Sequence, residues 1–319
     1  MDYEITIGQY RLQTVDKVHI VRSVEQLSDT AQITIPSHVA NRQIAIDDKL
    51  SVGDRVCIKL GYNGALQTEF EGFLNIIQND ADNYVLDCID GLYHFKVRMA
   101  DVQLKPVTLP ALLRRVVQTA NAAHGTSYKV ECDYNGGYDK FTIYHASGLD
   151  VLKKVQDEFK ANIYFEGNTL HCHAPYQCIK DEKPVILDFA ANVESADLKY
   201  VKKEDKKIEV EVVSHRPDGK IDKATYGDMG GEKRSLVRDG IPANQIQRIA
   251  REEYNVWRYD GYEGSVTCWL IPFIEPTASV TLRDPEQPSR TGNYYVIATE
   301  VTFDSNGGKR VVTVGRRLS

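Results

Sequence analysis

The stretch FTIYHASGLDVLKKVQDEFKANIYFEGNTLHCHAP, residues 141–175, has the pattern of a strand, a helix and a hairpin. Ser147 precedes the helical part and Asp150 follows three residues later, which is the spacing of a capping box. Apolar residues then recur at helical spacing and predict one buried stripe: Leu149, Leu152, Val155 and Phe159. The turn Gly167–Asn168 separates two short strand patterns and favours a tight hairpin. The stretch therefore predicts a compact α/β unit.

The residues before this unit have mainly the pattern of short β-strands. The predicted strands are Tyr3–Ile7, Lys17–Ser23, Ala31–Ile35, Arg55–Leu60, Phe70–Gln78 and Tyr84–Ile89. One helix is predicted over Leu109–Ala120, because its apolar residues keep i, i+3, i+4 spacing between a Thr108 cap and Gly125. Many short strands at regular spacing are typical of a small barrel or sandwich.

The β pattern returns after residue 176. The predicted strands are Val185–Phe189, Asp197–Val201, Ile208–Ser214, Gly264–Leu270, Ala278–Arg283, Asn293–Phe303 and Lys309–Gly315. Pro242–Trp257 is predicted as one helix, with Ile246 and Ile249 on one face. The polar segment Ile221–Arg238 contains several glycines, so we expect a flexible loop or an edge excursion there.

The two β-rich parts repeat one pattern. In each, a short strand leads to a long strand, a polar turn and a return strand; the long strands are Phe70–Gln78 and Tyr294–Phe303. We therefore predict a mainly β fold in which two similar small β-barrels flank an α+β middle domain. The predicted domains are residues 1–104, residues 105–175 and residues 176–319, the last with a loop and helix inserted over 208–257.

Composition limits the function. The net charge of −6 argues against a protein that coats DNA or RNA, because such surfaces are basic. The start MDYEITIGQYRLQ lacks a basic segment followed by an apolar core, and no apolar run approaches the roughly 18 residues of a membrane helix. Six scattered cysteines in such a chain favour free thiols over disulfides. We therefore expect synthesis and assembly in a cytoplasm.

Motifs for chemistry are weak. His171-Cys172-His173, with His145 and Cys178 nearby, lacks zinc-finger or ribbon spacing, so ordinary strand residues are favoured over a metal site. Gly227–Lys233 lacks the spacing of a phosphate loop. The acidic pairs lie in polar turn contexts, which favours solvated turns over catalytic carboxylates: Asp80 with Asp82, and Asp181 with Glu182. The sequence thus predicts no catalytic, cofactor-binding or metal-binding residues and no enzyme; a cell-wall hydrolase is the enzymatic alternative.

Tyrosine is abundant, with 18 residues against 9 phenylalanines. A tyrosine-rich β surface is compatible with sugar binding, but tyrosine is also common in protein interfaces, and we favour the interface. A carbohydrate-binding β module of a tail or cell-surface protein remains the alternative from another functional class.

Two groups of segments carry a resemblance to a known family. The first is LSVGDRVCIKLGY at residues 50–62 with FEGFLNII at residues 70–77, and the second is SGLDVLKKV at residues 147–155 with FKANIYFEGNTL at residues 159–170. The first group resembles the first barrel, and the second group the middle domain, of the phage late control protein D family, the baseplate hub proteins of contractile tails. The N-terminal part of the valine-glycine repeat spike protein of type VI secretion is similar, so the hub of such a spike is a further alternative.

The resemblance implies a homotrimer that forms a pseudo-sixfold ring between a hexameric tail tube and a trimeric spike. The implied partners are other copies of the chain, the tube protein, the spike or needle protein and other baseplate proteins, with DNA or cargo passing through the lumen without specific binding. The implied location is the baseplate of a phage or prophage tail, assembled in the bacterial cytoplasm. No cofactor is implied.

The chain also departs from the family's pattern. Many members have a Pro-Gly pair before the late strand of the second barrel, where this chain has Glu275-Pro276-Thr277-Ala278. The segment Ile208–Arg238 matches no part of the family's pattern. The sequence ends at Ser319 without a lysozyme-like or spike extension, so we expect a needle to be a separate protein.

Overall fold

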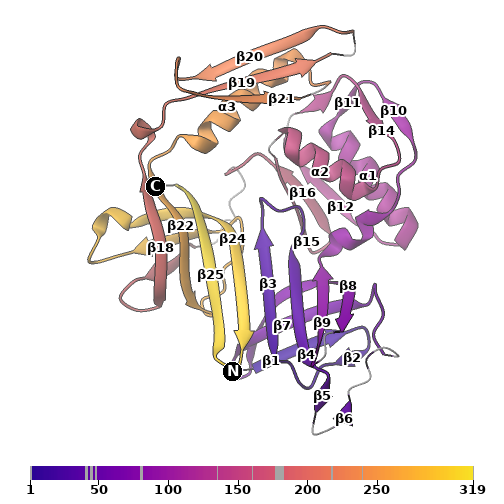
Figure 1. Cartoon of the computed structure of the whole chain (residues 1–319), viewed down its shortest axis with the longest axis vertical. Helices are drawn as coiled ribbons and strands as arrows, with labels where there is room; N and C mark the ends of the chain where they lie inside the picture. Colours follow the sequence, from indigo (N-terminus) through magenta and orange to yellow (C-terminus); the bar gives the residue numbers. More distant parts are fainter. Residues whose placement is uncertain are drawn as a thin grey trace. The chain divides into compact units, whose positions relative to one another are not determined.

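The computed structural model describes residues 2–318 except 40, 41, 44, 45, 47, 48, 80, 81, 135, 160, 177–182, 217 and 239 (Figure 1). The chain forms two compact units. The first comprises Met1–Tyr93, Lys180–Leu198 and Gly264–Ser319, and the second comprises His94–Ile179 and Lys199–Glu263. No helix in the described part of the chain is long and apolar enough to cross a membrane.

The first unit is built on one large β-sheet. Its N-terminal strands are β1 (Asp2–Ile7), β2 (Tyr10–Arg11), β3 (Lys17–Ser23), β4 (Thr30–Pro36), β7 (Arg55–Tyr62), β8 (Ala65–Asn79) and β9 (Asn83–Ile89). Its later strands are β17 (Val185–Asp188), β18 (Val193–Val201), β22 (Gly261–Trp269), β23 (Ser279–Arg283), β24 (Gly292–Asp304) and β25 (Gly307–Arg317). A separate small hairpin pairs β5 (His38–Val39) with β6 (Arg42–Gln43). The mainly β fold predicted from the sequence is confirmed.

The two halves of this sheet have the same strand order. The neighbours in the first half are β3-β4-β9-β8-β7-β1, and those in the second are β18-β22-β25-β24-β23-β17. If the six strands of each half are numbered from first to sixth along the chain, the neighbours in both halves follow the order second, third, sixth, fifth, fourth, first. One pairing that differs in direction is the pairing of the first strand, because β1 is antiparallel to β7 whereas β17 is parallel to β23. The repeat seen in the sequence is therefore a repeat of topology.

One connection differs greatly between the halves. The second and third strands of the first half, β3 and β4, are joined by residues 24–29 alone. The corresponding strands of the second half, β18 and β22, are joined by residues 202–260, which carry three further strands and a helix. The second half is thus the first half's topology with a large insertion at one loop.

Alternation of buried and exposed residues produces the core of the first unit. Strand β9 alternates without a break, so Tyr84, Leu86 and Cys88 point into the core while their neighbours are partly exposed. The same cluster contains Leu270, Val301 and Phe303 from the second half. One apolar core therefore extends across both halves.

The middle segment of the chain begins the second unit. Helix α1 (Leu109–His124) starts at Thr108, whose Oγ1 accepts a hydrogen bond from Ala111 N at 3.4 Å, and it ends at Gly125 with φ of 65°. Helix α2 (Gly148–Phe159) has the predicted capping box: Ser147 Oγ donates to Asp150 Oδ2 at 2.7 Å. The predicted stripe on α2 is wrong at Leu149, which is only half-buried.

Short strands surround these helices. Hairpin β15 (Asn162–Glu166) and β16 (Thr169–His173) turns at Gly167 with φ of 57°, and β12 (Lys129–Cys132) lies parallel to β16. Two further pairs join β10 (Val102–Leu104) to β14 (Phe141–Ile143) and β11 (Val107–Thr108) to β13 (Gly137–Tyr138). The 3-10 helices are η1 (Gly91–Lys96), η2 (Lys203–Asp205) and η3 (Pro288–Arg290).

Residues 221–238, for which the sequence predicts a flexible loop or an edge excursion, form the two edge strands of a small sheet, so the flexible loop is wrong. Strands β20 (Ile221–Gly227) and β21 (Glu232–Val237) flank β19 (Ile208–His215), and helix α3 (Ala243–Trp257) packs on this sheet (Figure 1). Only Ala224 of β20 is buried, so the strand lacks the apolar alternation that would have revealed it. Backbone pairing with β19 and cover by α3 define it instead.

The inserted segment groups with the middle segment. Gly137 N donates to Gln245 Oε1 of α3 at 2.8 Å, and Arg238 Nε donates to the Glu158 carbonyl at 3.1 Å. The division into residues 1–104, 105–175 and 176–319 stays a prediction. The compact units differ from it because these contacts join residues 199–263 to the middle segment.

Candidate interaction surfaces

The two sheet halves meet at a seam between β24 and β3. Ala298–Phe303 of β24 pairs antiparallel with Val18–Ser23 of β3, and Figure 1 shows these strands side by side. On the exposed side of the seam, His19 Nε2 lies 2.7 Å from Glu300 Oε1. This ladder joins residues nearly 300 positions apart in the sequence and makes the sheet continuous.

A buried ion pair connects the two halves. Arg310 of β25 and Glu69 of β8 are 0% and 2% exposed, and their two contacts are Nη2 to Oε1 at 2.7 Å and Nη1 to Oε2 at 3.2 Å. The guanidinium also donates to the carbonyls of Ile274 and Leu270, at 3.2 and 3.1 Å. A planar guanidinium suits this two-pronged geometry. The pair therefore couples the two halves inside the core.

A second charged group also connects the halves. Arg22 of β3 lies 3.2 Å from Asp29 and 2.9 Å from Glu275, which belongs to the second half. Asp29 N in turn donates to the buried carboxyl of Asp90 at 3.1 Å. Burial, together with the nearby charge of Asp29, raises the pKa of Asp90 well above its ordinary value. Such long-range pairs fix how the halves are joined.

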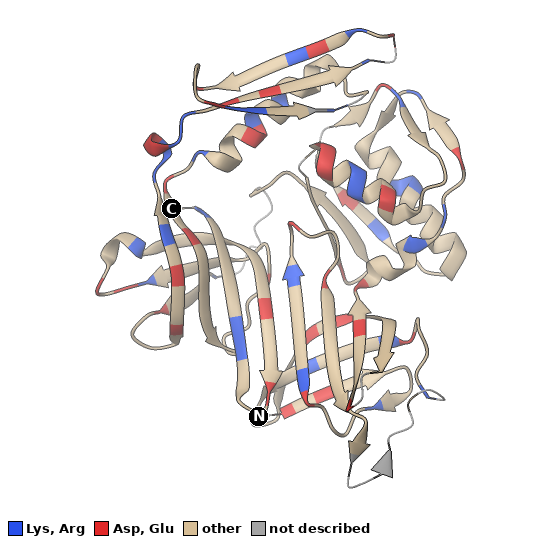
Figure 2. Ribbon diagram, in the orientation of Figure 1, with Lys and Arg blue, Asp and Glu red and all other residues tan. Residues whose placement is uncertain are grey.

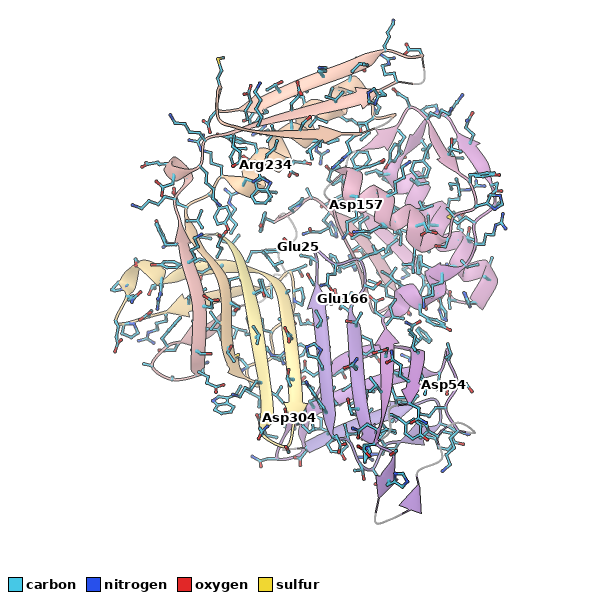
Figure 3. The ribbon with its side chains drawn as sticks, in the orientation of Figure 1. Glu25, Asp54, Asp157, Glu166, Arg234 and Asp304 are labelled. Carbon is cyan, nitrogen blue, oxygen red and sulfur yellow. The ribbon has the colours of Figure 1, made fainter. Side chains whose placement is uncertain are left out.

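Exposed apolar side chains gather near the turn between β24 and β25. Trp269 and Ile271 are 47% and 54% exposed, and with Tyr62 and Phe303 they line an open groove. Its polar residues are Asp304, Ser305 and Asn306; Figure 3 labels Asp304 at the end of β24. A half-exposed tryptophan beside apolar neighbours is typical of interaction surfaces.

The His171-Cys172-His173 segment is the body of strand β16. His171 Nδ1 lies 3.4 Å from Glu131 Oε2, and His173 Nδ1 lies 2.9 Å from Asp133 Oδ1, so both histidines face acidic residues of the β12 side. His145 belongs to a different place in the unit, where Arg98 Nη2 lies 2.7 Å from its Nδ1. Within the described residues, no group of three or more potential ligands could hold a metal ion. Cys178 lies outside the described residues.

The remaining candidates from the sequence are the glycine-rich segment 227–233 and the two acidic pairs. Gly227–Lys233 spans the end of β20, the turn at residues 228–231 and the start of β21, and Asp228 Oδ1 in the turn accepts from Arg258 at 2.7 Å. Asp82 directly precedes β9, and its carbonyl accepts from Ser37 N. Asp80, Asp181 and Glu182 lie outside the described residues. The absence of catalytic, cofactor-binding and metal-binding residues stays a prediction.

The tyrosines divide between core and surface. Several are almost fully buried: Tyr84, Tyr134, Tyr138, Tyr294 and Tyr295. Tyr144 and Tyr200 are exposed. Much of the tyrosine content therefore belongs to packing, which composition does not distinguish from a binding surface. Figure 2 shows that acidic and basic residues are interspersed along the strands and helices of both units.

The fold resembles solved structures over nearly its whole length. The 43 kDa tail protein of prophage MuSo2 from Shewanella oneidensis has a TM-score of 0.70 and 15% identity, covering 99% of this chain and 98% of that one. The tail protein from Neisseria meningitidis MC58 has a TM-score of 0.70 and 14% identity, covering 99% and 97%. The Escherichia coli c3393 protein, described as a component of the type VI secretion system, has a TM-score of 0.65 and 10% identity, covering 99% and 79%.

Comparisons by sequence give no such relatives, since no family model and no curated protein matches this chain. At 10–15% identity, the structural matches establish the fold alone. The chain has the fold found in phage tail proteins and in a component of the type VI secretion system.

Proposed function

We propose that this chain is the baseplate hub of a phage or prophage contractile tail and a member of the late control protein D family. Three copies form a pseudo-sixfold ring that joins a hexameric tail tube to a trimeric spike. The ring acts by matching symmetry, binds other baseplate proteins, and lets DNA or cargo pass through its lumen without catalysing a reaction. It is assembled in the bacterial cytoplasm and becomes part of the virion tail.

The repeated strand order is the observation that carries this proposal. A ring of three chains resembles a ring of six only if each chain supplies two similar units. The halves share one strand order over six strands each. They are also already joined side by side within one chain, through β24 and β3. The intrachain seam is thus a template for the contact between copies.

The template specifies which strands meet between copies. Within the chain, the fifth strand of the second half, β24, pairs with the second strand of the first half, β3. The equivalent contact joins the fifth strand of the first half, β8, to β18, the second strand of another copy's second half. Three such contacts alternate with three intrachain seams to close a ring.

Both strands have an edge segment in the described sheet that is in position for this contact. The ladder between β7 and β8 ends at the Arg55–Phe73 pair, although β8 continues to Asn79. Strand β18 lies at the end of the described sheet order, beside β22, and its residues 194–197 are all exposed. Ile76 of β8 is 46% exposed, as is typical of a side chain that a partner covers.

Oligomeric mass and two edge variants test the proposal. Light scattering of the wild type at high concentration should give three chains of 36.0 kDa, or about 108 kDa. The Asp197 carbonyl of β18 faces Gly264 of β22. Because successive residues of a strand point their backbone groups to opposite sides, the N–H of Ala196 faces away from β22. The variant Ala196→Pro therefore removes a hydrogen-bond donor from the outer edge of β18. Ile76→Lys places a charge on the opposing strand.

Both edge variants should stay monomeric with unchanged circular dichroism. The matched control Ile221→Lys changes an isoleucine that is 55% exposed on β20 and should remain trimeric. A wild type that stays monomeric at every concentration contradicts the trimer. Trimers in both edge variants would contradict the proposed β8–β18 contact.

A second candidate is the hub of a type VI-like secretion spike. The similarity to the Escherichia coli c3393 protein favours it, because that protein is described as a component of the type VI secretion system. Mass spectrometry of particles that copurify with the tagged chain distinguishes the two devices. Capsid and tape-measure proteins would support the phage tail, whereas a secretion sheath without capsid proteins would support the second candidate.

A further inference from the structure

Two cysteines of the second unit lie directly opposite each other on neighbouring strands. In the parallel ladder between β12 and β16, Lys129 pairs with Thr169, and the register continues to Cys132 opposite Cys172. Neighbouring strands are about 4.8 Å apart, and a disulfide needs Cα atoms about 4.4–6.8 Å apart. Residues in register on parallel strands also extend their side chains from the same face of the sheet. The backbone thus presents the two thiols to each other.

The residues on either side keep this register in place. Glu131 and Asp133 alternate with Cys132, and His171 and His173 alternate with Cys172. The acidic and histidine side chains meet in the two contacts at 3.4 and 2.9 Å described above. One face of the two strands therefore carries polar contacts, and the other carries the thiol pair.

The two thiols differ in exposure and acidity. Cys132 is half-buried, whereas Cys172 is fully buried. A hydrogen bond from the Cys172 thiol lowers the pKa of Cys132, and the same contact together with burial raises the pKa of Cys172. Burial instead raises the pKa of Cys88 to about 12 and that of Cys268 to about 11. Cys132 is therefore suited to react first, with Cys172 beside it to react second.

We propose that Cys132 and Cys172 form a reversible cross-strand disulfide when the protein meets a low-molecular-weight disulfide such as oxidised glutathione. The Cys132 thiol loses its proton and attacks one glutathione sulfur, which forms a mixed disulfide and releases one glutathione thiolate. The Cys172 thiol then loses its proton and attacks Cys132 Sγ, which forms the cross-strand bond and releases the second thiolate. The two protons end on the two released glutathiones, so one glutathione disulfide is reduced for each bond formed.

The bond links β12 covalently to the hairpin of β15 and β16. It closes a loop that contains β13, β14 and α2, so the middle segment becomes stapled across its own sheet. The inference does not depend on oligomeric state, because both cysteines belong to the same segment of one unit.

Thiol titration under denaturing conditions after treatment with oxidised glutathione tests the proposal. The chain has six cysteines, and the wild type should lose two titratable thiols, which dithiothreitol restores. Peptide mapping of the non-reduced digest should find Cys132 linked to Cys172. Cys132→Ser should form no cross-strand bond, and Cys172→Ser should stop at one glutathione on Cys132.

Cys57→Ser is the matched control, because Cys57 is also half-buried but lies on β7 of the other unit; it should form the bond as the wild type does. The oxidised wild type should also melt at a higher temperature than the reduced form, with no such difference in Cys132→Ser. Retention of all six thiols in the folded wild type, or a bond from Cys132 to a different cysteine, would overturn the proposal.

Discussion

At the scale of single residues, the fully buried Arg310 and Glu69 show how a charged pair joins parts of the chain that are distant in sequence. The buried arginine is tolerated in the core because its Nη atoms donate to the Glu69 carboxylate and to the carbonyls of Leu270 and Ile274, and the buried Glu69 is tolerated because Arg310 balances its charge. The strand Lys309–Gly315 was predictable from its alternation. The burial of an arginine within it was not, because the partner that compensates its charge is 241 positions away.

Removing one member of this pair should be costly. Glu69→Gln leaves the Arg310 charge buried without its counter-ion, so we expect the free energy of unfolding to fall by about 3–5 kcal/mol. Urea denaturation measures this free energy of unfolding. The double variant Glu69→Leu with Arg310→Met removes both charges and should recover much of the loss. A double variant less stable than Glu69→Gln would contradict this explanation.

The raised pKa of Asp90 predicts a stability that depends on pH. The folded state holds a proton on the Asp90 carboxyl more tightly than the unfolded state does. The contribution of this carboxyl to the free energy of unfolding is therefore fully present below about pH 4, and it is lost as the pH rises through the pKa of the folded state. In Asp90→Asn this dependence should disappear. The free energy of unfolding of the wild type minus that of the variant should therefore decrease as the pH rises from 4. Parallel pH profiles of the two proteins would exclude Asp90 as the source.

At the scale of elements, the helices were the most predictable parts of the fold. The six buried residues of α1 are apolar and keep the predicted i, i+3, i+4 spacing: Leu109, Leu112, Leu113, Val116, Val117 and Ala120. Strands β20 and β21 were missed, because a strand that is covered mainly through its backbone carries little apolar alternation. The surfaces proposed for assembly were equally invisible, since an open strand edge is a property of pairing and not of composition.

The capping box of α2 gives a prediction at this scale. Ser147→Ala removes the hydroxyl that accepts from Asp150 N at 3.2 Å and donates to Asp150 Oδ2, so we expect a loss of about 1 kcal/mol in the free energy of unfolding. The same change should raise the pKa of Asp150, because hydrogen bonds from Ser147 hold it below its ordinary value. Thermal unfolding and a carboxyl titration by NMR measure the two effects. An unchanged Asp150 pKa in the variant would argue against the box.

At the scale of the whole molecule, the two sheet halves share a core and are expected to depend on each other. The apolar cluster of the first half includes Leu270, Val301 and Phe303 from the second. The repeat was predictable from strand lengths and turns, but the join between the halves was not. Pairing between β24 and β3 brings together segments nearly 300 positions apart, for which local patterns hold no information.

A fragment comprising residues 1–93 tests this dependence. It contains every strand of the first half but lacks the β24 ladder and the Arg310 charge that balances Glu69. We therefore expect the fragment alone to lack a cooperative thermal transition, and a mixture with residues 180–319 to regain one. A fragment that by itself unfolds cooperatively near the wild-type temperature would show that the halves are independent.

The unequal connection between the second and third strands of the two halves has a consequence for any assembled ring. Six similar sheets arranged in a circle would look alike to a partner that contacts only their shared strands. A partner that reaches the 202–260 excursion would meet it at every other position, since only one half of each chain carries it. One loop can thus let the same annulus present a hexagon to one neighbour and a triangle to another.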